Sequence, residues 1–430
     1  MLRFIQNVLL VLLTSFFVFP FEFTYLPGVN TKMIMAAIGI FLLLYQQAKY
    51  RMFVIDYGII RIFIWALLVS FFGILSVIYN ETRDYAYASY IVSMLVWLFG
   101  AYTVVYCIKL TYGKIDIPLI SNFIIACAVF QCITAIMIEY IPAFSTWVDK
   151  TVLGVGFQKS FSDVKNERLY GIGAFLDVAG MRFSCILGII AIIVANLKGN
   201  KSNWITALYI TCFIIISCIG NMMSRTTIIG TCVALIYWLY CLLNNNKQSY
   251  KVIKYLAIVL AISLPLVIYF YHSNDTFYNK FRFGFEGFFN YFEAGEWRTQ
   301  SNDKLQNMFV LPDNLKTWLI GDGYFEDVLK NPYYIGHNWL YFYMGTDVGY
   351  SRFLFYFGIL GLGAFCGFFI QCATYLMKAF PAYKSLFLFI LAINFIVWIK
   401  VSSDCFTLFA LYLAATFLYP TDMRKLELEI

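Results

Sequence analysis

The chain has 430 residues, of which 61% are hydrophobic and only 13% are charged, with 31 Lys and Arg against 24 Asp and Glu. Because a soluble domain carries about a quarter charged residues, this composition excludes an ordinary soluble protein and favours a polytopic membrane protein. The formal charge of +7 is not a nucleic-acid signal, since basic residues of membrane proteins gather in cytoplasmic loops.

Twelve apolar runs follow one another along the chain, each close to the ~20 residues that a spanning helix needs. Only helices or closed barrels satisfy the backbone in lipid, and continuous runs without alternation select helices. The sequence predicts an all-α integral membrane protein with about twelve transmembrane helices, forming a single polytopic membrane domain over residues 1–430. The predicted spans are 2–19, 31–46, 57–79, 86–107, 117–141, 178–197, 204–220, 226–243, 252–271, 350–377, 384–400 and 404–420.

Lys and Arg are unevenly distributed between the two sides of these spans. With the N-terminus inside, the predicted inner segments carry fourteen of them and the short outer turns carry four. This bias predicts that both termini are cytoplasmic. The run 2–19 is interpreted as the first span, not as a cleaved signal peptide, because no small-residue cleavage site follows it. The four outer exceptions are Lys32, Arg83, Arg225 and Lys400.

Two predicted outer loops stand out by their length, residues 142–177 and residues 272–348. The inner loops are all short, which predicts that the protein works on its outer side. Aromatic runs at 281–285 and 288–292 are typical of short amphipathic helices on the membrane face, although the same rings could simply bury the loop on the helix bundle.

Four arginines near the outer ends of spans are candidates for function, since ionisable groups are costly there. Arg182 lies just inside a span, Arg225 begins one, Arg352 opens another and Arg298 lies in the second loop. Arginine matches phosphate oxygens with two parallel hydrogen bonds, and nearby helix ends add backbone donors. A structural alternative is that each arginine reaches the outer headgroups or pairs with Asp177, Asp347 or Asp404.

The segment from residue 336 to residue 352 holds the best local candidates for chemistry. It contains His337, one of only two histidines, together with Asn338, Asp347 and Arg352. A histidine titrates near neutral pH and can act as a base, although a solvated loop histidine is the simpler alternative. Neither a zinc site nor a nucleotide-binding Walker motif is expected, so the sequence predicts no metal and no cofactor.

Four stretches together make the chain resemble the O-antigen (Wzy-type) polysaccharide polymerases of the O-antigen ligase-like superfamily. The layout of about twelve spans with two large periplasmic loops is also similar. No single motif is specific, and the combination carries the resemblance. The stretches are residues 170–173 (Tyr-Gly-Ile-Gly) with Asp177, Gly180 and Arg182; residues 220–226 (Gly-Asn-Met-Met-Ser-Arg-Thr); residues 321–324 (Gly-Asp-Gly-Tyr) leading to His337 and Asn338; and residues 347–354 (Asp-Val-Gly-Tyr-Ser-Arg-Phe-Leu).

The resemblance implies a metal-independent, inverting glycosyltransferase with a GT-C-like fold in the bacterial inner membrane, with its active site on the periplasmic side. Donor and acceptor would both be oligosaccharide repeat units on undecaprenyl pyrophosphate, and a chain-length regulator is a possible partner. The implied catalytic residues are His337 as base, with Arg225 and Arg352 on the pyrophosphate. The implied substrate-binding residues are Arg182, Arg298, Asn338, Asp177 and Asp347.

Two other functions fit parts of the sequence. An O-antigen ligase would use the same donor but transfer the glycan to lipid A-core. A lipid-linked oligosaccharide flippase also has about twelve spans, but transporters place binding groups near the bilayer midplane. The predicted spans are nearly free of charge at mid-depth, which favours the polymerase.

Overall fold

The computed structural model describes residues 2–50, 56–153, 168–197, 202–244, 247–326, 328–337 and 342–418. Within these ranges the chain is all-helical, with two isolated β-bridges and no β-strand. Each predicted span corresponds to an apolar helix. The helices are α1 (Leu2–Val18), α2 (Thr31–Tyr50), α3 (Tyr57–Tyr79), α4 (Tyr90–Tyr112), α5 (Ile117–Tyr140), α8 (Leu176–Ala195), α9 (Ser202–Met223), α10 (Thr227–Leu243), α11 (Lys247–Ser273), α16 (Gly349–Ala379), α17 (Lys384–Val397) and α18 (Phe406–Leu418).

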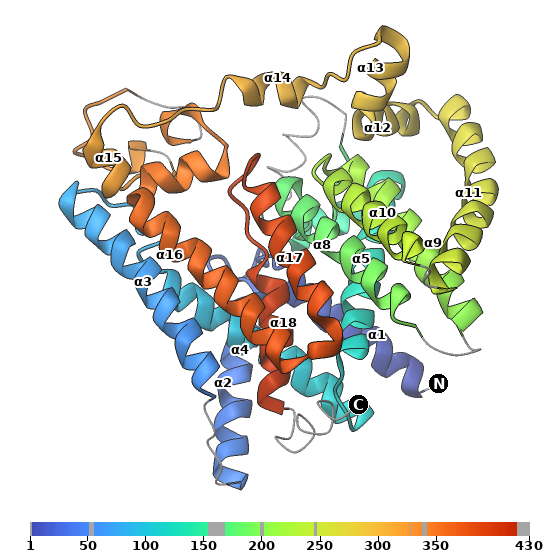
Figure 1. The fold of residues 1–430 in the computed structure, drawn as a ribbon, viewed down its shortest axis with the longest axis horizontal. Coiled ribbons are helices and arrows are strands. Elements are labelled where there is room, and N and C mark those ends of the chain that lie inside the picture. Colours follow the sequence, from blue (N-terminus) through green and yellow to red (C-terminus); the bar gives the residue numbers. More distant parts are fainter. Residues whose placement is uncertain are drawn as a thin grey trace.

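In the described part of the chain, seven of these helices are long and apolar enough to cross a membrane, and five apolar helices are shorter. The structure therefore confirms an all-helical chain of membrane-protein character, while the count of twelve spans and the GT-C-like fold stay predictions. The start of α1 and the end of α18 lie at the same end of the bundle, opposite the second loop (Figure 1). The side of the membrane on which the two termini lie stays a prediction.

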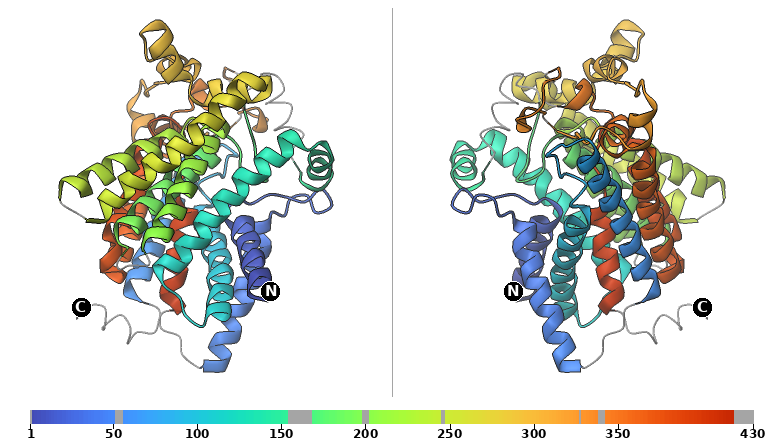
Figure 2. Two further views of the ribbon diagram at one scale, coloured as in Figure 1. Left: turned by 90° about the vertical axis from the view of Figure 1, so that its right-hand side faces the viewer. Right: turned by 90° about the vertical axis from the view of Figure 1, so that its left-hand side faces the viewer.

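The second loop is built from short helices that stand at one end of the bundle in every view (Figures 1 and 2). Both aromatic runs are helical as expected. Their rings pack on each other and on α11, as in the stacking of Tyr271 on Phe289 with centroids 5.8 Å apart. The loop elements are α12 (Asp275–Gly284), α13 (Glu286–Ala294), α14 (Gln300–Gln306), α15 (Leu315–Leu319), η1 (Val328–Lys330) and η2 (Tyr343–Gly345), and the first loop begins with α6 (Pro142–Thr151).

Local sequence explains several helix boundaries. Asp56 and Asp116 precede α3 and α5, and their carboxylates accept hydrogen bonds from the amides of Gly58 (2.9 Å) and Leu119 (2.8 Å). Such caps satisfy amides that have no partner within the helix. Gly113 ends α4 with a φ of 74°, a conformation that other residues rarely adopt. The polar residues between the apolar runs thus set where the spans begin and end.

Helix α8 lies at the centre of the bundle, and nearly all of its residues are buried. It approaches α10 closely at Gly230, whose amide donates to Ser184 Oγ at 3.3 Å, and Ser184 donates in turn to the Thr226 carbonyl at 2.9 Å. A Cβ atom at residue 230 would lie 2.2 Å from the Ser184 Cα. Only glycine allows this approach, and small residues at helix contacts are typical of membrane bundles.

Helix α16 is broken near its start, which the sequence did not predict. Phe357 and Gly358 leave the helical conformation, and Gly358 has a φ of 67°. The carbonyls released by the break accept hydrogen bonds from the Asp322 amide (to Phe355, 2.6 Å) and from Ser76 Oγ (to Tyr356, 2.7 Å). Freed backbone groups at this depth need protein partners, and here α3 and the segment after α15 supply them.

We expect Gly230→Ala to destabilise the bundle, because the added methyl group meets α8 backbone that cannot rotate away. Overpacking of this kind costs about 1–3 kcal/mol. Gly363→Ala in α16 is the matched control, since a Cβ there meets nothing within 4 Å. Thermal unfolding of the purified protein, followed by size-exclusion chromatography, should show a lower midpoint for Gly230→Ala alone. Equal midpoints for the two variants would contradict the close α8–α10 contact.

Candidate functional site

Arg225 fastens the second loop to the helix bundle. It lies in the turn between α9 and α10, and its side chain is 12% exposed. Its guanidinium forms an ion pair with Glu286 (2.5 Å), donates to the Phe283 carbonyl (3.0 Å) and to Ser301 Oγ (3.3 Å), and lies 4.0 Å from the Phe283 ring centroid. This residue therefore holds α12, α13 and α14 over the end of the bundle.

Arg352 joins three separate segments at the start of α16. It is 7% exposed and donates to Ser402 Oγ (2.5 Å) and to the Phe325 carbonyl (2.8 Å). Asp347 lies 3.8 Å away as an ion-pair partner. The Phe325 and Phe342 rings cover its guanidinium at 3.8 and 4.2 Å. The side chain is thus fixed in place, but its Nε is buried and has no hydrogen-bond partner among the described residues.

Arg182 differs from the other two arginines because two of its guanidinium nitrogens are buried without a hydrogen-bond partner among the described residues. It is 6% exposed, and its Nε and Nη1 have no hydrogen-bond partner in the described part of the chain. The rings of Phe19 and Trp97 flank it at 5.5 and 5.7 Å. Lys32 lies over the same Trp97 ring at 4.3 Å, and Asp404 is the carboxylate in electrostatic range of both cations.

Lys400 lies among charged residues from several elements. It follows α17 and interacts electrostatically with Asp177 and Asp347, and with Arg225. Burial lowers the pKa of the Lys400 ammonium, and the two aspartates oppose this shift. Burial also raises the pKa of Asp404, a few residues further along. This end of the bundle therefore gathers several cations in a poorly solvated place.

Asp347 is the carboxylate with the most useful acid–base properties in this region. Burial and the nearby charge of Asp177 raise the pKa of Asp347 to about 7, against the opposing charges of Arg352 and Lys400. A carboxyl group that titrates near neutral pH can both accept and release a proton under physiological conditions. Thr226 donates a hydrogen bond to Asp177 at 3.4 Å, which joins the start of α8 to the start of α10.

Two of the remaining predicted residues, His337 and Arg298, lie on the surface of the second loop. His337 is exposed, and its carbonyl accepts a hydrogen bond from the Tyr334 hydroxyl at 2.9 Å. Arg298 is exposed as well and pairs with Asp303 at 2.9 Å, close in sequence. Asn338 lies outside the described residues. This hydrogen bond and this ion pair join His337 and Arg298 to residues near them in sequence, and not to Arg182, Arg225 or Arg352.

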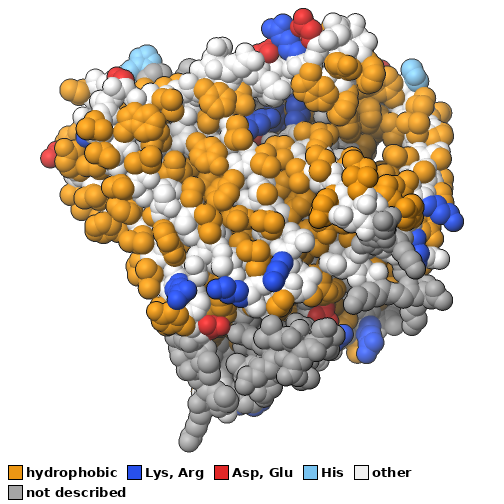
Figure 3. All heavy atoms as spheres, viewed as in Figure 1, with side chains coloured by type: hydrophobic (Ala, Val, Ile, Leu, Met, Phe, Trp, Pro, Cys, Tyr) orange, Lys and Arg blue, Asp and Glu red, His pale blue; other side chains and the backbone are white. Residues whose placement is uncertain are grey.

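We call Arg182, Arg225, Arg352, Lys32 and Lys400 the cationic cluster. Figure 3 shows Lys and Arg side chains set back in a hollow below α14, while the surrounding face is mainly hydrophobic. A second row of basic side chains lies towards the opposite end of the molecule in this view, as the predicted orientation requires. Lys32 and Lys400 were not chosen as site residues from the sequence, although both were exceptions to the charge bias.

Among the described residues, no three His, Cys, Asp or Glu side chains lie together as a metal site would require. The fold and the cluster define an apolar helical protein with buried cations gathered at one end. Comparisons with protein-family models, curated proteins and solved structures give no match for this chain.

We expect Arg225→Gln to release the second loop, because Glu286 would be left partly buried without its cation. Breaking such a pair costs about 3 kcal/mol. Arg298→Gln is the matched control, since its ion pair with Asp303 is exposed and contributes little. Limited proteolysis of the purified protein should cleave the segment 275–306 faster in Arg225→Gln only. Equal cleavage of the two variants would show that Arg225 does not hold the loop.

Proposed function

We propose that the protein is a membrane-embedded glycosyltransferase of the O-antigen polymerase type. It would join repeat units carried on undecaprenyl pyrophosphate at the periplasmic face of the inner membrane. The observation that carries the proposal is the buried guanidinium of Arg182. Its Nε and Nη1 have no hydrogen-bond partner among the described residues, and it interacts electrostatically with Lys32 and with one carboxylate, Asp404. Two cations beside a single carboxylate leave an excess positive charge in a poorly solvated place, and a pyrophosphate would compensate it.

The proposed reaction is a direct displacement at the anomeric carbon of the donor. A hydroxyl of the acceptor sugar attacks, the bond from the anomeric carbon to the pyrophosphate oxygen breaks, and the configuration inverts. Arg182 and Lys400 compensate the negative charge that grows on the leaving pyrophosphate. Arg352 donates hydrogen bonds to Ser402 and Phe325, and so keeps the segments that carry these residues in place around the leaving group. No nucleotide is needed, because the lipid pyrophosphate is already an activated donor.

Two residues compete for the role of base. His337 is the base that the family resemblance implies, but it is exposed in this structure. Asp347 lies 3.8 Å from Arg352, which belongs to the cationic cluster, and burial raises the pKa of Asp347 to about 7. We favour Asp347, because the base must stand near the bond that forms, and the cations that bind the leaving group fix that position. His337 then orients the acceptor or has no part in the chemistry.

The alternatives have different support. A ligase would use the same cations on the same donor, and the acceptor alone distinguishes it. A flippase would favour broken helices near the bilayer midplane. The break in α16 lies eight to nine residues after its start, or roughly 13 Å along the axis. The carbonyls that this break frees accept hydrogen bonds from the segment after α15. The break therefore holds a loop against α16 and does not favour a flippase.

Arg182→Gln should abolish polymer formation, because the leaving group loses a charge partner, with a rate loss of about 10²–10³. The test is complementation of a strain that lacks this gene, read on a lipopolysaccharide gel with protein levels matched. Arg298→Gln, with its exposed arginine, should keep the full ladder.

The same gel separates the functions. Single-repeat bands without a ladder, in the deletion strain and with Arg182→Gln, are expected for a polymerase. Bare core in the deletion strain would favour the ligase or the flippase. A full ladder from Arg182→Gln would remove the cationic cluster from the mechanism.

The pH dependence of the rate should identify the base. If Asp347 removes the proton, activity is highest when its carboxylate is ionised, so the rate should rise as the pH increases through about 7 and then level off. Initial rates of polymer formation by purified protein on lipid-linked repeat units would measure this. His337→Gln should still show the fall in rate below pH about 7. Asp347→Asn should lose this pH dependence together with most of the rate. The reverse pattern would assign the base to His337.

A further inference from the structure

A cavity of about 920 Å³ lies beside the cationic cluster and has no role in the steps above. Its volume falls in the range of about 300–1,000 Å³ that is usual for ligand sites. Residues from four parts of the chain line it, namely the end of α3 with the turn that follows it (Ile74 to Tyr85), Lys316 in α15, the segment from Asp322 to Gly336, and Tyr343 in η2. These parts come together only in the folded protein.

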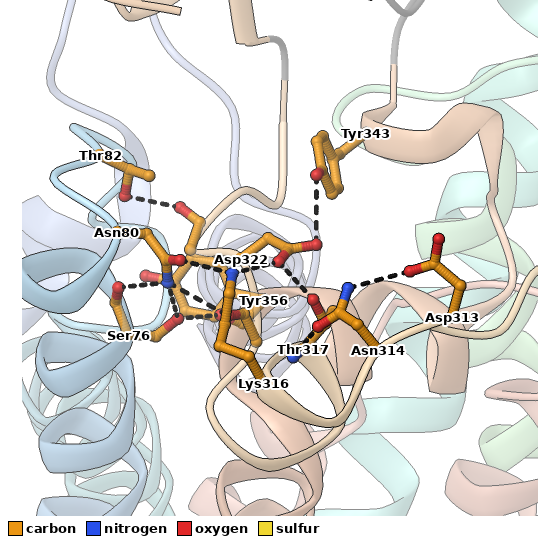
Figure 4. A network of polar contacts seen from close by, with 12 residues as sticks. Ser76, Asn80, Thr82, Asp313, Asn314, Lys316, Thr317, Asp322, Tyr343 and Tyr356 are labelled. Atoms are coloured by element: carbon orange, nitrogen blue, oxygen red, sulfur yellow. Dashed lines mark hydrogen bonds and ion pairs between the residues drawn. The ribbon is translucent and has the colours of Figure 1, made fainter. Parts of the chain in front are cut away.

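The floor of the cavity is a fixed polar network (Figure 4). Lys316 donates to Asn80 Oδ1 (2.6 Å) and pairs with Asp322 (2.7 Å), while Tyr343 donates to the same carboxylate at 3.2 Å. Thr317 also donates to Asp322, at 2.6 Å. Because the charges of Lys316 and Asp322 compensate each other, the floor offers polar groups without a net charge.

The rim of the cavity carries exposed aromatic rings. Tyr85 is 60% exposed and Tyr333 is 72% exposed. The Arg83 guanidinium lies 5.0 Å over the Tyr333 ring. Glu81 stands in the same turn with a φ of 54°, a strained conformation for a residue other than glycine. Strain of about 1–3 kcal/mol persists mainly where function requires it.

The chemistry of the lining selects one class of ligand. Its charged residues are two acids and two bases, Glu81 and Asp322 against Arg83 and Lys316, so it does not attract a phosphate or a lipid headgroup. Exposed tyrosine rings suit a ligand with flat apolar faces, and the polar groups suit one with many hydroxyls. Sugar rings combine both, because one face presents C–H groups while the edges present hydroxyls.

The wall of the cavity adjoins the proposed reaction site. Tyr324 lines it, and the carbonyl of the next residue, Phe325, is the hydrogen-bond acceptor of Arg352. Consecutive Cα atoms are about 3.8 Å apart, so the cavity wall and the cationic cluster share one short segment. We infer that the cavity is a glycan-binding subsite that holds the sugars of the acceptor, with Tyr85 and Tyr333 stacking on them; its role as the acceptor subsite rests on the proposed function.

The test is direct binding of a glycan without its lipid. Oligosaccharide released by mild acid from lipid-linked repeat units of cells that encode this chain, labelled with a fluorophore at its reducing end, is titrated with the purified full chain by fluorescence polarisation. Tyr85→Ala should weaken binding about tenfold, since one stacking ring is lost. Tyr85→Phe keeps the ring, and Tyr291→Ala removes a similarly exposed tyrosine on α13, so both should bind within about twofold of the wild type.

A second variant guards against a purely structural effect. Glu81→Gly should raise the thermal unfolding midpoint, because glycine adopts a positive φ without strain, and it should weaken glycan binding. Undiminished binding by Tyr85→Ala, or no binding by the wild type, would overturn the inference. Arg182→Gln should bind the free glycan normally. The two proposals can fail separately. If glycan binding depends on Tyr85 but deletion of the gene leaves the lipopolysaccharide ladder intact, the glycan-binding site would be supported and the polymerase function would be contradicted.

Discussion

The buried side chain of Arg352 is the interaction on which this arrangement depends. From the start of α16 it reaches the α17–α18 loop through Ser402 and the cavity wall through the Phe325 carbonyl. A guanidinium is planar and always charged, so burying it requires that fixed acceptors surround it. Here the acceptors lie on segments far apart in the sequence, which means that one desolvated charge sets the relative positions of three parts of the fold.

The break in α16 follows from the same requirement. An unbroken helix from Gly349 would keep the carbonyls of Phe355 and Tyr356 for itself and leave the segment after α15 without partners. Because Gly358 adopts a positive φ, those carbonyls turn outward and bind the Asp322 and Gly323 amides. The loop that carries Tyr324 and Phe325 is thereby held against α16. The cavity and the cationic cluster are neighbours because both are built on this one segment.

The sequence predicted the helices well and the site only in part. Apolar length decides where a helix runs, and this property is local, so twelve apolar runs correspond to twelve apolar helices. Charge bias is also local, and its four outer exceptions proved informative. Lys32, Arg225 and Lys400 belong to the cationic cluster, and Arg83 lines the cavity. Arg182 was chosen as a candidate because it lies inside a span. The sequence did not show, however, that Arg225 forms an ion pair with Glu286 whereas two nitrogens of Arg182 have no hydrogen-bond partner among the described residues.

What the sequence could not supply was convergence in space. The pKa of Asp347 depends on burial and on Asp177, 170 residues earlier in the chain, and no spacing rule encodes that proximity. The tyrosine cavity was missed for the same reason, since Tyr85 and Tyr333 meet only after folding. Under the proposed reaction there is a chemical reason for the tyrosine cavity and the cationic cluster to be two distinct sites. A sugar bound next to excess positive charge would compete with the pyrophosphate for the same donors, whereas a charge-balanced cavity reserves those cations for the leaving group.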